Sequence, residues 1–163
     1  MLDTFFGLPM HPLIVHATVV VVPTAAVAVV LAAFWTRFRE WAAAAPMGLS
    51  ALALVLTPLS TSSGESLEHR ISGTSLISDH ARLGDLLIWW VVPLAVLSAG
   101  LWWFRRRSTT GALVTWGLPA LSVVVAAGTL VTVALIGHSG AQAAWDGEMT
   151  SSSAVSSQSD SDG

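Results

Sequence analysis

Charged residues are so widely spaced along this chain that long, uncharged, apolar stretches separate them. Four stretches reach the roughly 20 apolar residues that a helix needs to cross the hydrocarbon core of a bilayer. They cover about residues 13–35, 41–61, 83–104 and 111–137. Membrane helices tolerate proline where neighbouring groups satisfy the freed carbonyls, so we expect bends and not breaks at Pro23, Pro46, Pro58, Pro93 and Pro119. The pattern predicts four continuous membrane-spanning helices.

The connections between these stretches decide how the helices are arranged. Short connections favour antiparallel neighbours, so we expect an all-α, up-down four-helix membrane bundle over residues 1–147. Ala44 and Gly48 have the spacing of small residues that lets two helices approach closely. Residues 148–163 are rich in serine and almost free of apolar side chains, and such a segment cannot offset the entropy of ordering. We expect this tail to be disordered and extracytoplasmic.

Arginine placement predicts the orientation of the bundle. Five of the seven arginines follow the first and third stretches, namely Arg37, Arg39, Arg105, Arg106 and Arg107. Basic residues in short loops are retained on the cytoplasmic side, so both termini are expected on the opposite side. Aromatic residues at the same two turns are typical of the membrane interface: Phe34, Trp35, Phe38, Trp41, Trp102, Trp103, Phe104 and Trp116. The N-terminal segment MLDTFFGLPM is acidic, which favours a retained span over a signal peptide.

Composition agrees with a membrane protein and removes several classes of function. Hydrophobic residues make up 53% of the chain and charged residues 10%, with a mean hydropathy of +0.70. The net charge of −3 supplies no basic stripe for nucleic acid. The absence of cysteine excludes disulfides, thiolate metal sites and thiol nucleophiles. The chain has no recognisable combination of serine, histidine and acidic residues that would indicate a hydrolase. The histidines are therefore the remaining candidates for binding a ligand.

All five histidines fall at the predicted extracytoplasmic ends of the four helices: His11, His16, His69, His80 and His138. Titratable groups at membrane depth are costly without a partner, so we expect His16, His80 and His138 to share a ligand or proton site. His69 is expected to be solvated, and His11 to begin the first helix. His80 is expected in the first turn after an N-cap at Ser78 or Asp79, with Gly84 leaving room for a flat ligand.

Haem b is the first candidate ligand, because its iron accepts two histidines from facing helices. We expect His16 and His80 as the axial pair, with His138 or His11 as substitutes. Arg70 or Arg82 would pair with the propionates. Such a site would transfer electrons to or from a quinol or an extracytoplasmic redox protein.

Two alternatives to haem remain open. Copper or zinc also suits imidazole and would use His16 and His80, with oxygen ligands from Asp79, Asp85 or Glu68. Asp85 has a second interpretation as an ion-pair partner of Arg82 one helical turn away. The other alternative is a non-enzymatic subunit that packs in a larger membrane complex or oligomer.

Three motifs together resemble a known family. MHPLIVH opens the first predicted helix, HARLGD opens the third, and LIGHSGAQAAWDG ends the fourth. With these motifs, residues 8 to 147 resemble the small bacterial membrane proteins catalogued as domain of unknown function 2231. The resemblance implies a four-helix protein of the bacterial cytoplasmic membrane, sometimes found near redox modules and loosely labelled cytochrome-b-like.

The chain departs from the family pattern at two of these motifs. Relatives usually continue the first motif with Phe-Pro, where this chain has Ala17-Thr18. Many relatives also carry a further histidine at the end of the last motif, where this chain has an Ala-Trp-Asp-Gly run. Any ligand set shared by the family therefore lacks one histidine here.

Overall fold

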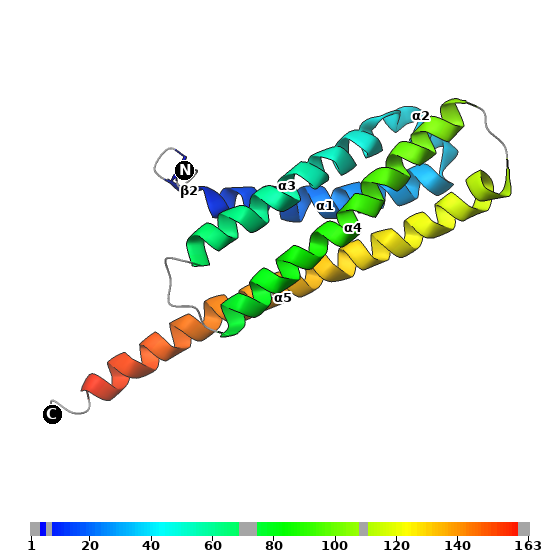
Figure 1. Ribbon diagram of the computed structural model, residues 1–163. Coiled ribbons are helices and arrows are strands. Elements are labelled where there is room, and N and C mark those ends of the chain that lie inside the picture. The colour runs from blue at the N-terminus through cyan, green and yellow to red at the C-terminus, as the bar shows by residue number, and fades with distance from the viewer. Residues whose placement is uncertain (1–3, 6–7, 69–74, 108–110, 160–163) are drawn as a thin grey trace.

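Almost all of the described chain is helical. The computed structural model describes residues 4–5, 8–68, 75–107 and 111–159. Its four long helices are α1 (Met10–Phe34), α3 (Ala45–Glu68), α4 (Ser75–Arg106) and α5 (Leu118–Ser159) (Figure 1). A short helix joins α1 to α3 and a π-helical turn precedes α5: α2 (Thr36–Ala42) and η1 (Leu113–Gly117). The predicted all-α class is confirmed.

A minimal antiparallel strand pair precedes the first helix. Strands β1 (Thr4–Phe5) and β2 (Leu8–Pro9) have two residues each, and Thr4 lies opposite Pro9. A pair this short is only marginally stable on its own. Helix α1 begins at the very next residue, Met10, close to the start that the His11-Pro12 dipeptide predicts.

Among the described residues, four helical segments are long and apolar enough to span a membrane, which confirms the predicted number. They are Leu13–Phe34, Ala45–Gly64, Ser78–Arg106 and Leu113–Gln142. The second begins later than expected, because α2 and a turn at Ala43, whose φ is 47°, intervene after α1. Pro23, Pro58 and Pro93 lie inside unbroken helices, as expected.

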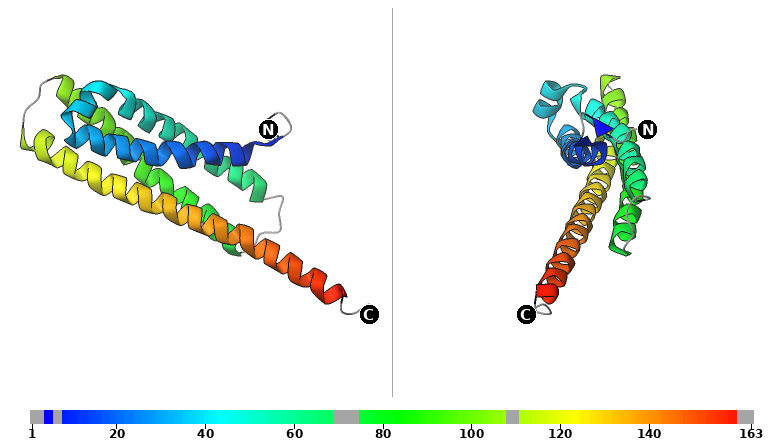
Figure 2. Two further views of the ribbon diagram at one scale, coloured as in Figure 1. Left: turned by 180° about the vertical axis from the view of Figure 1, so that it is seen from behind. Right: turned by 90° about the vertical axis from the view of Figure 1, so that its left-hand side faces the viewer.

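The long helices form an up-down bundle. Helix α1 packs against α3 and α5, and α4 packs against the same two helices, so α1 and α4 are diagonal partners. Figures 1 and 2 show the helices running side by side, with the start of α1 and the end of α5 at the same end of the bundle. This arrangement confirms the antiparallel topology.

Small side chains fill the interior of the bundle. Ala25, Ala26 and Val29 of α1 and Ala53 of α3 are fully buried, which brings the helix backbones close together. Most buried hydroxyls donate to a carbonyl four residues earlier in their own helix: Thr18, Ser50, Thr57, Ser122, Thr129 and Thr132. Large apolar side chains are also exposed on the outside of α1, α3, α4 and α5. In a membrane, most of these side chains would face lipid.

A side chain of α4 packs directly on a glycine of α5. A Cβ atom built at Gly128 would overlap Trp90 Cζ3 and lie 2.5 Å from Trp90 Cε3 and Cη2, so the indole ring rests directly on the glycine. By contrast, a Cβ at Gly48 would meet nothing within 4 Å, and Gly48 is exposed. The close approach expected at Ala44 and Gly48 is therefore wrong, because that face of α3 points away from its neighbours.

Helix α5 continues well past its membrane-spanning part. The span ends at Gln142, whereas the helix ends at Ser159 and extends beyond the other helices (Figure 1). Residues 148–159 are thus helical, whereas disorder was expected for residues 148–163, and residues 160–163 lie outside the described residues. Extending an existing helix costs far less than nucleating one, and no proline interrupts this segment.

Candidate functional site

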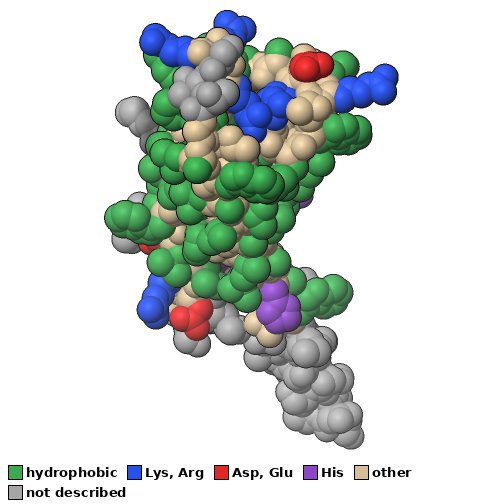
Figure 3. Space-filling model, turned by 90° about the vertical axis from the view of Figure 1, so that its right-hand side faces the viewer, with side chains coloured by type: hydrophobic (Ala, Val, Ile, Leu, Met, Phe, Trp, Pro, Cys, Tyr) green, Lys and Arg blue, Asp and Glu red, His purple; other side chains and the backbone are tan. Residues whose placement is uncertain are grey.

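One end of the bundle holds the described histidines. This histidine end comprises the start of α1, the end of α3, the start of α4 and the end of the α5 span. Figure 3 shows histidine at the end opposite most of the arginines, with apolar side chains between the two ends. His69 and Arg70 lie outside the described residues, and so does the side chain of His11.

His80 joins α4 to α5 at this end. Its Nδ1 lies 3.0 Å from Ser139 Oγ, and that hydroxyl donates to the carbonyl of Ile136 at 3.0 Å. The Ser139 hydroxyl thus lies between Nδ1 of His80 and the carbonyl of Ile136, and the tautomer of the ring sets whether Nδ1 donates or accepts. The ring also packs on Gly140, where an added Cβ would lie 3.0 Å from Cε1 of His80. His80 is thus held in place by the end of the fourth span.

The other two described histidines lie on outer surfaces. His16 is exposed on α1, two residues from buried Thr18 and therefore about 200° around the helix from it. His80 lies seven residues before buried Leu87, on the inward face of α4. His138 is exposed on α5. His16 and His80 therefore lie on the diagonal helices α1 and α4, with His16 exposed and His80 turned toward α5.

The described residues provide no group of three histidine, aspartate or glutamate side chains close enough to hold a metal ion. Binding of haem b, copper or zinc stays a prediction from the sequence.

Three smaller expectations at the start of α4 also differ from the structure. The helix begins at Ser75, before the N-cap predicted at Ser78 or Asp79, so His80 lies in its second turn. The space expected beside Gly84 holds Thr61 of α3, whose Cγ2 would be 3.7 Å from an added Cβ. Within the described part of the chain, exposed Arg82 and Asp85 form no ion pair.

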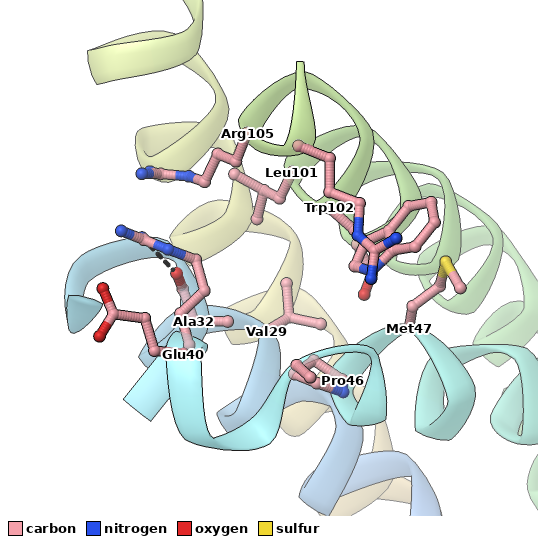
Figure 4. Close-up of a pocket in the computed structure, with 12 residues that line it drawn as sticks. Val29, Ala32, Glu40, Pro46, Met47, Leu101, Trp102 and Arg105 are labelled. Carbon is pink, nitrogen blue, oxygen red and sulfur yellow. Dashed lines mark hydrogen bonds between the residues drawn. The ribbon is translucent and has the colours of Figure 1, made fainter. Parts of the chain in front are cut away.

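The opposite end of the bundle contains a cavity of about 280 Å³, which we call the arginine cavity. It lies between the last turns of α1, helix α2, the start of α3 and the end of α4 (Figure 4). Its charged lining consists of Arg39, Arg105, Arg106 and Glu40. Its other lining residues are Val29, Ala32, Ala43, Pro46, Met47, Ser98, Leu101 and Trp102.

Two arginines of this cavity close the C-terminal end of α1. Arg39 donates from Nη1 to the carbonyl of Ala32 at 2.9 Å, and Arg105 donates from Nη2 to the carbonyl of Ala33 at 3.2 Å. The last carbonyls of a helix have no partner within it and carry its negative dipole end, so a guanidinium stabilises them. Both arginines are consequently half-buried and fixed in direction.

The arginines that line the cavity have further N–H donors besides the two that bond to α1. Nε of Arg105 is buried and has no hydrogen-bond partner. Arg106 lies over the Trp102 ring, with its Cζ 4.5 Å from the ring centroid. In the sequence these arginines indicate only the orientation of the bundle. Their convergence depends on the bend after α1, which no local pattern predicts.

Four apolar spans around a closely packed interior, with polar groups gathered at the two ends, define an integral membrane helical bundle. A family model described as "Predicted membrane protein (DUF2231)" matches residues 7–153, and the chain belongs to this family. The resemblance to this family is thereby confirmed. No curated protein matches the chain. No solved structure matches it either.

Proposed function

We propose that this chain is a non-enzymatic, multi-pass subunit of the bacterial cytoplasmic membrane that supports a larger membrane complex. The observation that carries the proposal is the filled interior of the bundle. Its buried positions hold alanine, valine and leucine, together with hydroxyls that mostly bond within their own helices. Such an interior suits a rigid scaffold whose outer surface meets lipid and neighbouring proteins.

In this proposal the arginine end lies in the cytoplasm and both termini lie outside. The positive-inside tendency supports this orientation, because Arg37, Arg39, Arg105 and Arg107 all lie at one end of the bundle. The aromatic side chains at that end support it too. Trp35 stacks on Phe38 with ring centroids 6.2 Å apart, and Trp41 is 82% exposed at the level where a headgroup region would lie.

Reporter fusions test the orientation. A periplasm-active reporter fused after residue 163 should be active, and the same reporter inserted after Arg107 should be inactive. A cytoplasm-active reporter at the same two positions should give the opposite result. Activity of the cytoplasmic reporter at residue 163 would contradict the proposed orientation.

Native size tests the role as a subunit. The tagged chain, extracted from its own membrane with a mild detergent, should migrate as a defined assembly far larger than its 17.0 kDa mass plus detergent. Assembly should survive His16→Ala and His138→Ala, since both side chains are exposed, and also His80→Ala, since His80 bonds to Ser139 within the same chain and not to a neighbouring protein. A species of monomer size, or loss of assembly together with loss of a bound metal in the histidine variants, would overturn the proposal.

A further inference from the structure

We propose that the arginine cavity binds the phosphate headgroup of an anionic membrane lipid. The first observation is the divided character of its lining. Arg39, Arg105 and Arg106 bring three positive charges and Glu40 one negative charge, so the charged lining carries a net charge of +2. The rest is mainly apolar, including Val29, Met47, Leu101 and Trp102. A ligand that fills the cavity must combine an anion with hydrocarbon.

The second observation is the set of unused guanidinium donors. Each guanidinium has five N–H groups, and Arg39 and Arg105 are each seen to use one of them on α1 carbonyls. The buried Nε–H of Arg105 lacks any partner, which is costly for a charged donor. Among the described residues, no ion pair joins Glu40 to these arginines. Phosphate oxygens are strong acceptors for guanidinium groups and would accept from the remaining Nη–H groups of the lining arginines.

The third observation is the depth of the cavity in the bundle. It lies where α1 and α4 end their membrane-spanning segments, at Phe34 and Arg106. Lipid phosphates lie at this level of a bilayer, and basic pockets between helices on the cytoplasmic side are a recurrent type of lipid headgroup site. A free phosphate would make no apolar contacts with the apolar lining residues, whereas the glycerol and first acyl carbons of a lipid would pack against them.

The test uses the full chain purified in dodecyl maltoside and native mass spectrometry. Three probes are titrated separately: dioleoyl phosphatidylglycerol, dioleoyl phosphatidylcholine and inorganic phosphate. We expect one phosphatidylglycerol per chain to bind at least tenfold more tightly than phosphatidylcholine. In the double variant Arg39→Gln/Arg105→Gln, phosphatidylglycerol affinity should fall tenfold or more, as the loss of charged hydrogen bonds implies.

A matched control uses arginines that do not line the cavity. Arg37 and Arg107 are exposed at the same end, and Arg107 lies over Trp103 instead. Arg37→Gln/Arg107→Gln removes the same charge and should change the affinity less than threefold. Equal losses in the two double variants would overturn the site, because generic attraction to the basic end would then explain the binding.

A second variant keeps every arginine. Ser98 is buried on α4 and lines the cavity, so Ser98→Leu should fill it and weaken phosphatidylglycerol binding while circular dichroism shows an intact helical fold. Undiminished binding in folded Ser98→Leu would overturn the proposal. Binding of inorganic phosphate that depends on Arg39 and Arg105, without retained lipid, would overturn the lipid assignment and identify a free phosphate as the ligand.

Discussion

The contact between Gly128 and Trp90 predicts that a single added methyl group will destabilise the bundle. In Gly128→Ala the new Cβ would overlap the Trp90 ring, which lies on the glycine with Cε3 and Cη2 both 2.5 Å from that position. To avoid the new methyl group, the Trp90 ring must rotate away from α5 toward lipid, and the packing between α4 and α5 is then lost. Overpacking of this kind costs about 1–3 kcal/mol.

The matched control is Gly100→Ala on α4, where an added Cβ meets nothing within 4 Å. Both substitutions gain about 1 kcal/mol in helix propensity, so their difference isolates the collision. The free energy of unfolding is measured by circular dichroism in mixed dodecyl maltoside and dodecyl sulfate micelles. We expect Gly128→Ala to be less stable than Gly100→Ala by about 1–3 kcal/mol.

Replacing the Trp90 ring with a smaller side chain should remove this loss of stability. In a Trp90→Leu background, Gly128→Ala should cost less than about 0.5 kcal/mol, since mutations at residues in contact are coupled. Gly128→Ala as stable as Gly100→Ala, or a penalty unchanged by Trp90→Leu, would refute the packing inferred between α4 and α5.

Three further predictions concern the histidine end and the tail. Ser139→Ala should lower the free energy of unfolding by about 0.5–1.5 kcal/mol in the same micelles, because His80 loses a hydrogen bond. The control His138→Ala, at an exposed residue, should change the free energy of unfolding by less than about 0.5 kcal/mol. Equal effects of the two substitutions would contradict the contact between His80 and Ser139. Absorption spectra and elemental analysis of protein from haem-replete cells test the ligand hypotheses: a Soret band lost in His80→Ala would support haem b, one copper or zinc ion per chain lost in the same variant would support a metal site, and neither signal is expected of a purely structural subunit. Deleting residues 148–163 should change stability by less than about 0.5 kcal/mol, since α5 there extends beyond the bundle, and a larger loss would show that the tail packs on it.

Sequence reasoning located the spans well because hydropathy and length are local properties. The bilayer requires about 20 apolar residues per crossing, so the positions of charged residues mark approximately where each span begins and ends. The short turns then allow only an antiparallel order. The sequence is less informative about the histidines. Their positions predict a shared end of the bundle, but not the direction in which each side chain points. His16 and His80 share that end, yet His16 is exposed and His80 faces α5.

The amino-acid sequence by itself determined the four apolar spans, the antiparallel order and the separation of five of the seven arginines from the histidines along the bundle. Each depends on the transfer of single residues between water and hydrocarbon, which needs no knowledge of neighbours. Only the tertiary structure decided which helices touch, that Gly128 and not Gly48 accepts a neighbouring side chain, and that Arg39 and Arg105 converge on one cavity. These features depend on the rotation of each helix about its axis, which is set by packing between residues far apart in the chain.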